Sequence, residues 1–248
     1  GTGLDCAVID LGDRYLVFKS DPITFASEQI GWYAVQINAN DIATTGAEPH
    51  WMLATLLLPE GKADRVLVER IFDQLTQACV ELNISLVGGH TEVTHGLDRP
   101  LISATLVGEV EKGRLVTPRG ARAGDRVLLT KGVPVEAVTI LAREFPGRLL
   151  GQINQAELDE ARDYLFQPGI SVVKDARVVC QAGRVTTMHD PTEGGLLSAL
   201  WELSEASGAL LVVDPQAVPV PDLARRVCTV FGIDPLASIA SGALLMTV

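Results

Sequence analysis

Hydrophobic positions in the first half of the chain follow both helix-like and strand-like spacings. Residues 62–83 place apolar side chains four and three positions apart, which predicts an amphipathic helix. Residues 51–58 form a nearly continuous apolar run, which predicts a strand buried on both faces. A second, apolar helix is predicted from about residue 27 to the breakers Gly46 and Pro49. Further strands are predicted at 6–9, 15–18, 84–87 and 101–110.

The second half repeats this mixture after a basic, turn-rich stretch at 117–125. That stretch predicts a boundary between two domains, residues 1–118 and 119–248. Beyond it we expect strands at 126–130, 185–187, 210–213 and 239–248, and helices at 135–145, 154–165, 171–182, after Gly195 and at 221–231. The pattern indicates an α/β or α+β fold in two domains. The last residues read as mid-strand, so we expect the second domain to be truncated at its C-terminal end.

Composition narrows the class of protein. The 248 residues are 47% hydrophobic and 21% charged, a globular balance, and the net charge of −11 disfavours nonspecific nucleic-acid binding. No apolar run approaches the roughly 18 residues of a membrane helix, and no signal peptide opens the chain. The four cysteines form no CxxC pair, which argues against a zinc site and favours a reducing cytoplasm, with all four as buried apolar residues.

Acidic side chains form the first candidate site. Asn38 and Asp41 are three residues apart on the apolar helix and therefore project from one face. Asp5 and Asp21 lie at predicted element ends, with Asp21 at the tip of a strand that runs out at residues 19–22. Carboxylates in such places can bind magnesium, which allows an acidic protein to hold a polyphosphate. The alternative is that these residues only cap helices and form turns.

A glycine pair forms the second candidate site, in the stretch Gly88-Gly89-His90-Thr91 at a predicted strand end. Paired glycines allow close approach of a ligand, and their amides can face an anion. The Walker A pattern is missing, and the alternative is an ordinary turn.

The third candidate site is the stretch 189–195, between a predicted strand and a predicted helix. Such a helix start can receive a phosphate or a polarised carbonyl group. The alternative is that Asp190 or Thr192 caps the helix, with Pro191 near its first turn.

Six motifs in this order resemble those of the aminoimidazole ribonucleotide (AIR) synthetase superfamily: LDCAV, KSD, NANDIATTGAEP, LVGGHTE, HDPTEGGL and IASGALL. The resemblance covers nearly the whole chain. It implies an N-terminal α/β domain whose sheet pairs with its twin in a homodimer, a C-terminal α/β domain, and bound ATP and magnesium.

The resemblance also implies a role for individual residues. The magnesium ligands would be Asp5, Asp21 and Asp41, and the catalytic residues would be His90 and Asp190. The residues that bind ATP would be Asn38, Gly88, Gly89, Thr91, Thr192 and Gly194. His90 replaces the acid of the Gly-Gly-acid-Thr motif, and since imidazole is a poor magnesium ligand the reaction stays open. Selenophosphate synthetases are similar in having His there.

The last two motifs look most like the hydrogenase maturation factor that dehydrates a carbamoyl group. That resemblance implies transfer of the ATP γ-phosphate to an amide or carbonyl oxygen of a small-molecule or protein-tail acceptor, and a hydrogenase maturation partner. Such factors carry the carbamoyl group on a C-terminal cysteine, which the printed sequence lacks, so the chain is either trimmed or a relative with another substrate. The alternatives are a kinase such as thiamine-monophosphate kinase, a selenophosphate synthetase-like enzyme, and a non-catalytic nucleotide-binding assembly protein. A metal-binding protein that uses His90 and His95 has only a loose HxxxxH spacing in its favour.

Overall fold

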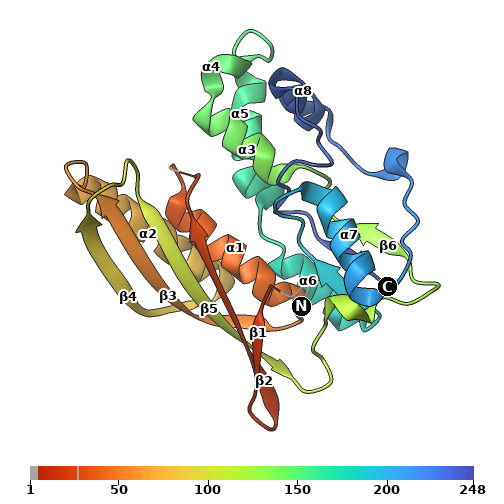
Figure 1. The fold of residues 1–248 in the computed structure, drawn as a ribbon. Coiled ribbons are helices and arrows are strands. Elements are labelled where there is room, and N and C mark those ends of the chain that lie inside the picture. Colours follow the sequence, from red (N-terminus) through yellow and green to blue (C-terminus); the bar gives the residue numbers. More distant parts are fainter. Residues whose placement is uncertain (1–4, 27) are drawn as a thin grey trace. The chain divides into compact units, whose positions relative to one another are not determined.

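The computed structural model describes residues 5–26 and 28–248, which form two compact units, Asp5–Leu115 and Val116–Val248 (Figure 1). Each unit combines a β-sheet with helices, so the predicted α/β class is confirmed. In the described residues, no helix is both long and apolar enough to cross a membrane.

The first unit is a five-stranded sheet with two long helices. The strand order is β1-β2-β5-β3-β4, and every neighbouring pair is antiparallel except β3 and β4, which are parallel. The elements are β1 (Ala7–Asp10), β2 (Arg14–Ile23), α1 (Ile30–Thr44), β3 (Glu48–Pro59), α2 (Arg65–Leu82), β4 (Ser85–Thr94) and β5 (Leu101–Glu111).

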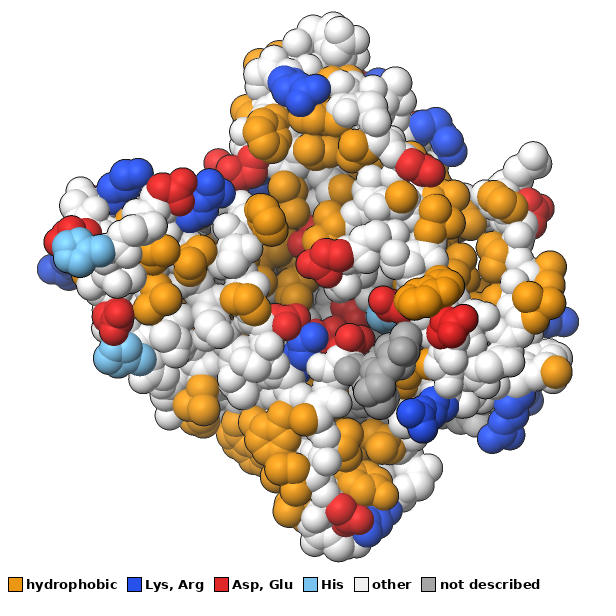
Figure 2. Space-filling model, viewed as in Figure 1, with side chains coloured by type: hydrophobic (Ala, Val, Ile, Leu, Met, Phe, Trp, Pro, Cys, Tyr) orange, Lys and Arg blue, Asp and Glu red, His pale blue; other side chains and the backbone are white. Residues whose placement is uncertain are grey.

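Strand alternation gives this sheet one buried face and one open face. Val17, Met52 and Ile102 are fully buried on the face that α1 covers. On the other face, Trp51 is 39% and Leu53 46% exposed, and Figure 2 shows uncovered hydrophobic side chains on this unit. The prediction that 51–58 is buried on both faces is therefore wrong, because alternate side chains of β3 point away from the helices.

The second unit contains a small antiparallel sheet of order β6-β8-β7. Its core packs Leu196 and Leu203 of α7 with Leu245 of β8, all of them buried. The elements are β6 (Val127–Leu129), α3 (Val135–Glu144), α4 (Pro146–Leu149), α5 (Gln155–Asp163), α6 (Val173–Ala182), β7 (Thr187–His189), α7 (Gly195–Ser207), α8 (Asp222–Phe231) and β8 (Leu245–Thr247), with short helical turns at Pro118–Gly120, Leu165–Gly169 and Pro215–Ala217.

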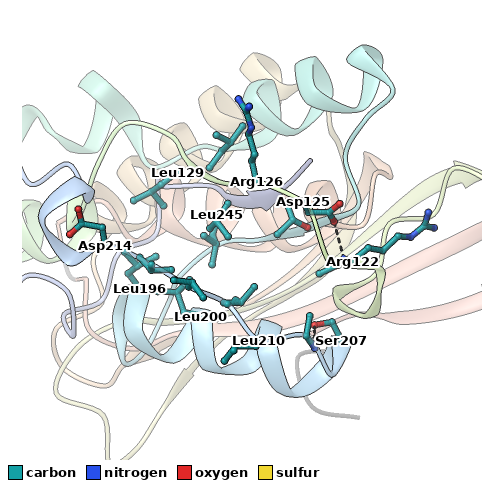
Figure 3. A pocket seen from close by; sticks show the side chains of 18 of the residues that line it. Arg122, Asp125, Arg126, Leu129, Leu196, Leu200, Ser207, Leu210, Asp214 and Leu245 are labelled. Carbon is teal, nitrogen blue, oxygen red and sulfur yellow. Dashed lines mark hydrogen bonds between the residues drawn. The ribbon is translucent and has the colours of Figure 1, made fainter.

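The predicted strand at 210–213 is absent. Leu210 and Val212 are 88% and 86% exposed, and a cavity of about 1160 Å³ is lined by this segment, β6 and α7 (Figure 3). Residues 210–213 do not pair with β6, which among the described strands pairs only with β8; this segment and β6 both line the cavity. The predicted strand at 239–248 is shorter than expected, since only Leu245–Thr247 forms a strand that pairs with β6 and β7.

Candidate functional site

The first unit brings two of the predicted metal ligands together around a lysine. Lys19 and Asp21 are two residues apart on β2 and point to the same face of the sheet. Asp41 reaches that face from α1. Lys19 Nζ lies 3.0 Å from Asp21 Oδ2 and 2.9 Å from Asp41 Oδ2. We call these three side chains the acidic cluster.

The acidic cluster is largely withdrawn from water. The side chains of Asp41, Lys19 and Asp21 are 4%, 13% and 35% exposed. Burial raises the pKa of Asp41 to about 6, a rise that Lys19 opposes and that the charges of Asp5 and Asp21 increase. Burial by itself lowers the pKa of Lys19, but Asp41 and Asp21 raise it above its ordinary value. At neutral pH the cluster therefore holds one cation between two carboxylates.

Asn38 supports the cluster through the backbone. Its Oδ1 accepts a hydrogen bond from the Asp21 backbone N–H at 3.0 Å, and its Nδ2 donates to the Ala34 carbonyl at 2.9 Å. Because Asn38 is fully buried and both ends of its amide are used, it fixes β2 against α1 in this structure. Asp5 is exposed and lies close enough to the cluster for its charge to raise the pKa of Asp41.

The donor chemistry of the cluster fits magnesium. No group of three or more His, Cys, Asp or Glu side chains in the described ranges could hold a metal ion by itself. Mg²⁺ in nucleotide sites keeps several waters and takes only one or two carboxylates, with phosphate oxygens completing the shell. Asp21 and Asp41 supply those carboxylates at a position where Lys19 now places its ammonium group. Bound there, magnesium would neutralise charge on the ATP phosphates.

The predicted glycine-rich turn lies inside a strand instead. Residues 88–92 belong to β4 and pair with residues 53–57 of β3. A Cβ on Gly89 would lie 1.8 Å from the Ala54 carbonyl oxygen, so glycine is required here by the close approach of β3. The prediction that this stretch, with Gly88 and Thr91, follows a strand end as a loop is wrong, because pairing with β3 continues to Thr94.

His90 lies apart from the acidic cluster within the first unit. Asp21, Ala104, Ala54 and Gly89 are register partners across β2, β5, β3 and β4, so their side-chain positions share the helix-facing side. His90, the next residue, points to the open side, where its Nε2 lies 3.2 Å from Glu92 Oε2. β4 is three strands from β2, which corresponds to about 14 Å. One unit therefore does not bring His90 to Asp21 and Asp41.

The loop before α7 holds the remaining predicted residues. Asp190 is buried at the end of β7, and Thr192 accepts a hydrogen bond at its carbonyl oxygen from the Gly195 N–H at 2.9 Å. Gly194 is the N-cap of α7 and no side chain caps the helix, so the alternative that Asp190 or Thr192 caps it is wrong. Another amide of the first turn, on Leu197, donates to the Leu236 carbonyl oxygen at 3.1 Å. The helix start thus has fewer amides available for an anion than the sequence alone suggests.

Glu136 is a candidate that the sequence reading missed. It lies in the first turn of α3, is 5% exposed, and its Oε2 has no hydrogen-bond partner. Burial raises the pKa of Glu136 to about 7; Glu193, in the loop before α7, also raises it, whereas Ser241 lowers it. A buried carboxyl poised near neutral pH is typical of groups that transfer protons. The available signal was an acid surrounded by apolar residues in a predicted helix.

Other features lie outside these candidates. A second cavity of about 310 Å³ is lined in part by Lys131, Glu160 and Asp163. His189 Nε2 lies 2.6 Å from Glu202 Oε2 and joins β7 to α7. No predicted site residue lines the large cavity of Figure 3.

Known proteins resemble the chain over almost its full length. Residues 3–110 match the family described as AIR synthase related protein, N-terminal domain, and residues 122–248 match the corresponding C-terminal domain. A putative hydrogenase expression/formation protein of Methanocaldococcus jannaschii is 28% identical over 98% of this chain and 71% of its own length. Carbamoyl dehydratase HypE of Azotobacter vinelandii is 33% identical over 97% of this chain and 69% of its own length.

Solved structures agree with these relatives. Hydrogenase maturation protein HypE in complex with ATP superimposes with a TM-score of 0.80 at 27% identity, over 98% of this chain and 71% of that one. Thiamine monophosphate kinase from Aquifex aeolicus shares the fold, with a TM-score of 0.81 at 21% identity over 98% of this chain and 82% of that one. The predicted resemblance is confirmed: the chain belongs to the AIR synthase related family.

Proposed function

We propose that this protein is a magnesium- and ATP-dependent enzyme that activates an amide or carbonyl oxygen by phosphoryl transfer, as a carbamoyl dehydratase. The observation that carries the proposal is the convergence of Asp21 and Asp41 on one cation position. Two carboxylates directed at one point fit a metal that is shared with phosphate oxygens. The relatives named carbamoyl dehydratase and the ATP-bound HypE supply the reaction and the nucleotide.

The chemistry follows from what dehydration of a carbamoyl group requires. The carbonyl oxygen attacks the γ-phosphorus and ADP leaves, which turns a poor leaving group into a phosphate ester. The carbon–oxygen bond then breaks, the oxygen departs on inorganic phosphate, and the nitrogen loses both protons as the nitrile forms. A base is needed for those protons. In this chain the buried Glu136 and Asp190 of the second unit are the carboxyl candidates for that step.

The fate of the γ-phosphate tests the reaction. The protein is incubated with magnesium, γ-labelled ATP and a peptide that carries an S-carbamoyl cysteine, and the products are separated. We expect label in inorganic phosphate and a peptide lighter by one water. Label on an acceptor would instead identify a kinase. ATP binding without turnover on any acceptor tested would support a nucleotide-binding assembly protein. The names of the relatives also motivate a protein partner in hydrogenase maturation.

We also propose a homodimer through the open face of the first sheet. This face carries Trp51 and Leu53, and apolar side chains that large on a sheet surface mark an interaction site. We expect Leu53→Lys to convert a dimer into a monomer in light scattering at micromolar concentration. Val66→Lys is the matched control, since Val66 is an apolar α2 residue that is 70% exposed, away from this face. A wild-type protein that is monomeric under these conditions would count against the dimer.

His90 offers a test that is free of folding effects. Its side chain is 66% exposed and therefore packs little, so His90→Ala should change the free energy of unfolding by less than about 0.5 kcal/mol. Because His90 points to the open side of the sheet, which is the proposed dimer face, it would act on the phosphate or acceptor only at a site shared with the partner copy. A neutral or charged imidazole there pairs with phosphate or acceptor rather than with magnesium, so we expect this variant to lower turnover more than magnesium-ATP affinity. His90→Asp should retain nucleotide binding. Kinetics and thermal melts on both variants check this, and unchanged turnover in His90→Ala would remove His90 from the site.

A further inference from the structure

Lys19 places a positive charge where a divalent cation is expected. Its ammonium group lies within hydrogen-bonding distance of Asp21 and Asp41, while its side chain is only 13% exposed. One ammonium offsets one of the two carboxylate charges, and the nearby Asp5 adds further negative charge. The cluster therefore remains net negative, and a cation of higher charge could replace the ammonium.

We propose that Lys19 is a resident counter-ion that makes metal binding conditional on the nucleotide. This inference rests on the proposed function for the identity of the nucleotide. Metal alone must displace the ammonium from both carboxylates. Metal that arrives with ATP brings phosphate oxygens that can accept the displaced ammonium.

The physical asymmetry lies in what happens to Lys19 after displacement. A largely buried ammonium that loses both partners is costly, because a charge out of water is tolerated only when it is paired. Magnesium also gives up its water shell reluctantly, so it gains little from two carboxylates that are already neutralised in part. A phosphate removes the penalty, since lysine binds phosphate through strong charge-assisted hydrogen bonds. The residue thus couples metal and nucleotide within one site.

The positions of these side chains on β2 and α1 allow a metal ion to replace the Lys19 ammonium group between the two carboxylates. Lys19 and Asp21 extend from the same face of one strand, and Asp41 stands opposite on α1. Asn38 accepts a hydrogen bond from the Asp21 backbone N–H at 3.0 Å, so the backbone position of Asp21 does not depend on the lysine. The long, unbranched lysine side chain is the flexible member of the cluster.

Manganese binding in the absence of nucleotide tests the role of Lys19. Mn²⁺ alone is titrated into the wild-type protein and into Lys19→Met, and free metal is followed by electron paramagnetic resonance. We expect Lys19→Met to bind Mn²⁺ at least tenfold more tightly than the wild type, equivalent to about 1.4 kcal/mol. The gain should vanish in Lys19→Met combined with Asp41→Asn. Lys112→Met is the matched control, because Lys112 pairs with Asp10 at 2.9 Å outside the acidic cluster.

Three results separate the possible outcomes. Equal Mn²⁺ affinity in the wild type and Lys19→Met would overturn the proposal. If Lys19→Met fails to fold, Lys19→Gln takes its place. Tight Mn²⁺ binding by the wild-type protein in the absence of nucleotide would also overturn the proposal. Binding of a non-hydrolysable ATP analogue is measured separately. Absence of that binding in the wild-type protein would refute the proposed function, whereas the manganese comparison would still decide the role of Lys19.

Discussion

Asp21→Asn and Asp41→Asn are each expected to weaken magnesium-dependent ATP binding by tenfold or more, about 1.4 kcal/mol. Each change removes one of two carboxylates that converge on a single cation position. Asparagine keeps the shape of the side chain but offers no negative charge to the metal. Calorimetry with a non-hydrolysable ATP analogue, with and without magnesium, measures the loss.

The two variants should differ in stability. Asp41 is 4% exposed at its side chain and Asp21 is 35% exposed. Loss of the buried carboxylate leaves Lys19 with one partly exposed partner, which is destabilising, but it also removes the burial cost that raises the pKa of Asp41 to about 6. The wild type loses stability as the pH rises from 3.8 to about 6 and Asp41→Asn does not, so we expect the melting temperature of Asp41→Asn relative to the wild type to rise with pH over this range. We expect only a small change for Asp21→Asn, whose side chain is partly exposed. Asp13→Asn, whose side chain is 70% exposed in the β1–β2 turn, is the control for both measurements. Wild-type affinity in both cluster variants would exclude them from the nucleotide site.

The sequence predicted the elements well where periodicity is strong. The helix predicted at 135–145 is observed at Val135–Glu144, and the strand predicted at 101–110 at Leu101–Glu111. It failed where the end of a strand depends on a partner. β2 continues to Ile23 because β5 pairs with it along that length, so Asp21 lies within the strand and not at its tip. The segment 210–213 has strand-like residues but pairs with no strand in the part of the chain that the structure describes.

The misplaced end of β2 also concealed a residue of the candidate site. A strand that includes residues 19–21 puts Lys19 and Asp21 on one face by its period of two. A strand thought to run out at Lys19 gives no such relation. Glu136 was missed for another reason. An acidic residue in the first turn of a helix is normally explained by its favourable interaction with the helix dipole. Only packing shows that this carboxyl is buried beside Glu193 and Ser241.

Glu136→Gln is expected to stabilise the protein at pH 8 by about 3 kcal/mol and at pH 5 by less than about 1 kcal/mol. The pKa of Glu136 is raised from 4.5 to about 7 in the folded chain, so the folded state holds a proton that the unfolded state releases over this range. Stability is then lost as the pH rises from 4.5 to about 7, and the full penalty persists above that. Glutamine cannot ionise and removes the penalty. Urea unfolding at the two pH values measures the difference, with Glu205→Gln on the exposed side of α7 as the control.

Glu136→Gln also tests whether the destabilising carboxyl of Glu136 is needed for the reaction. Glu136 is buried and its Oε2 has no hydrogen-bond partner, so it destabilises the fold. Functional sites often keep such destabilising groups because the reaction needs them, here for proton transfer. We expect Glu136→Gln to lower turnover at least tenfold while ATP affinity stays unchanged. If the variant is both more stable at pH 8 and fully active, Glu136 is a structural cost without a catalytic role. Asp190 would then be the carboxyl candidate of this unit for the base.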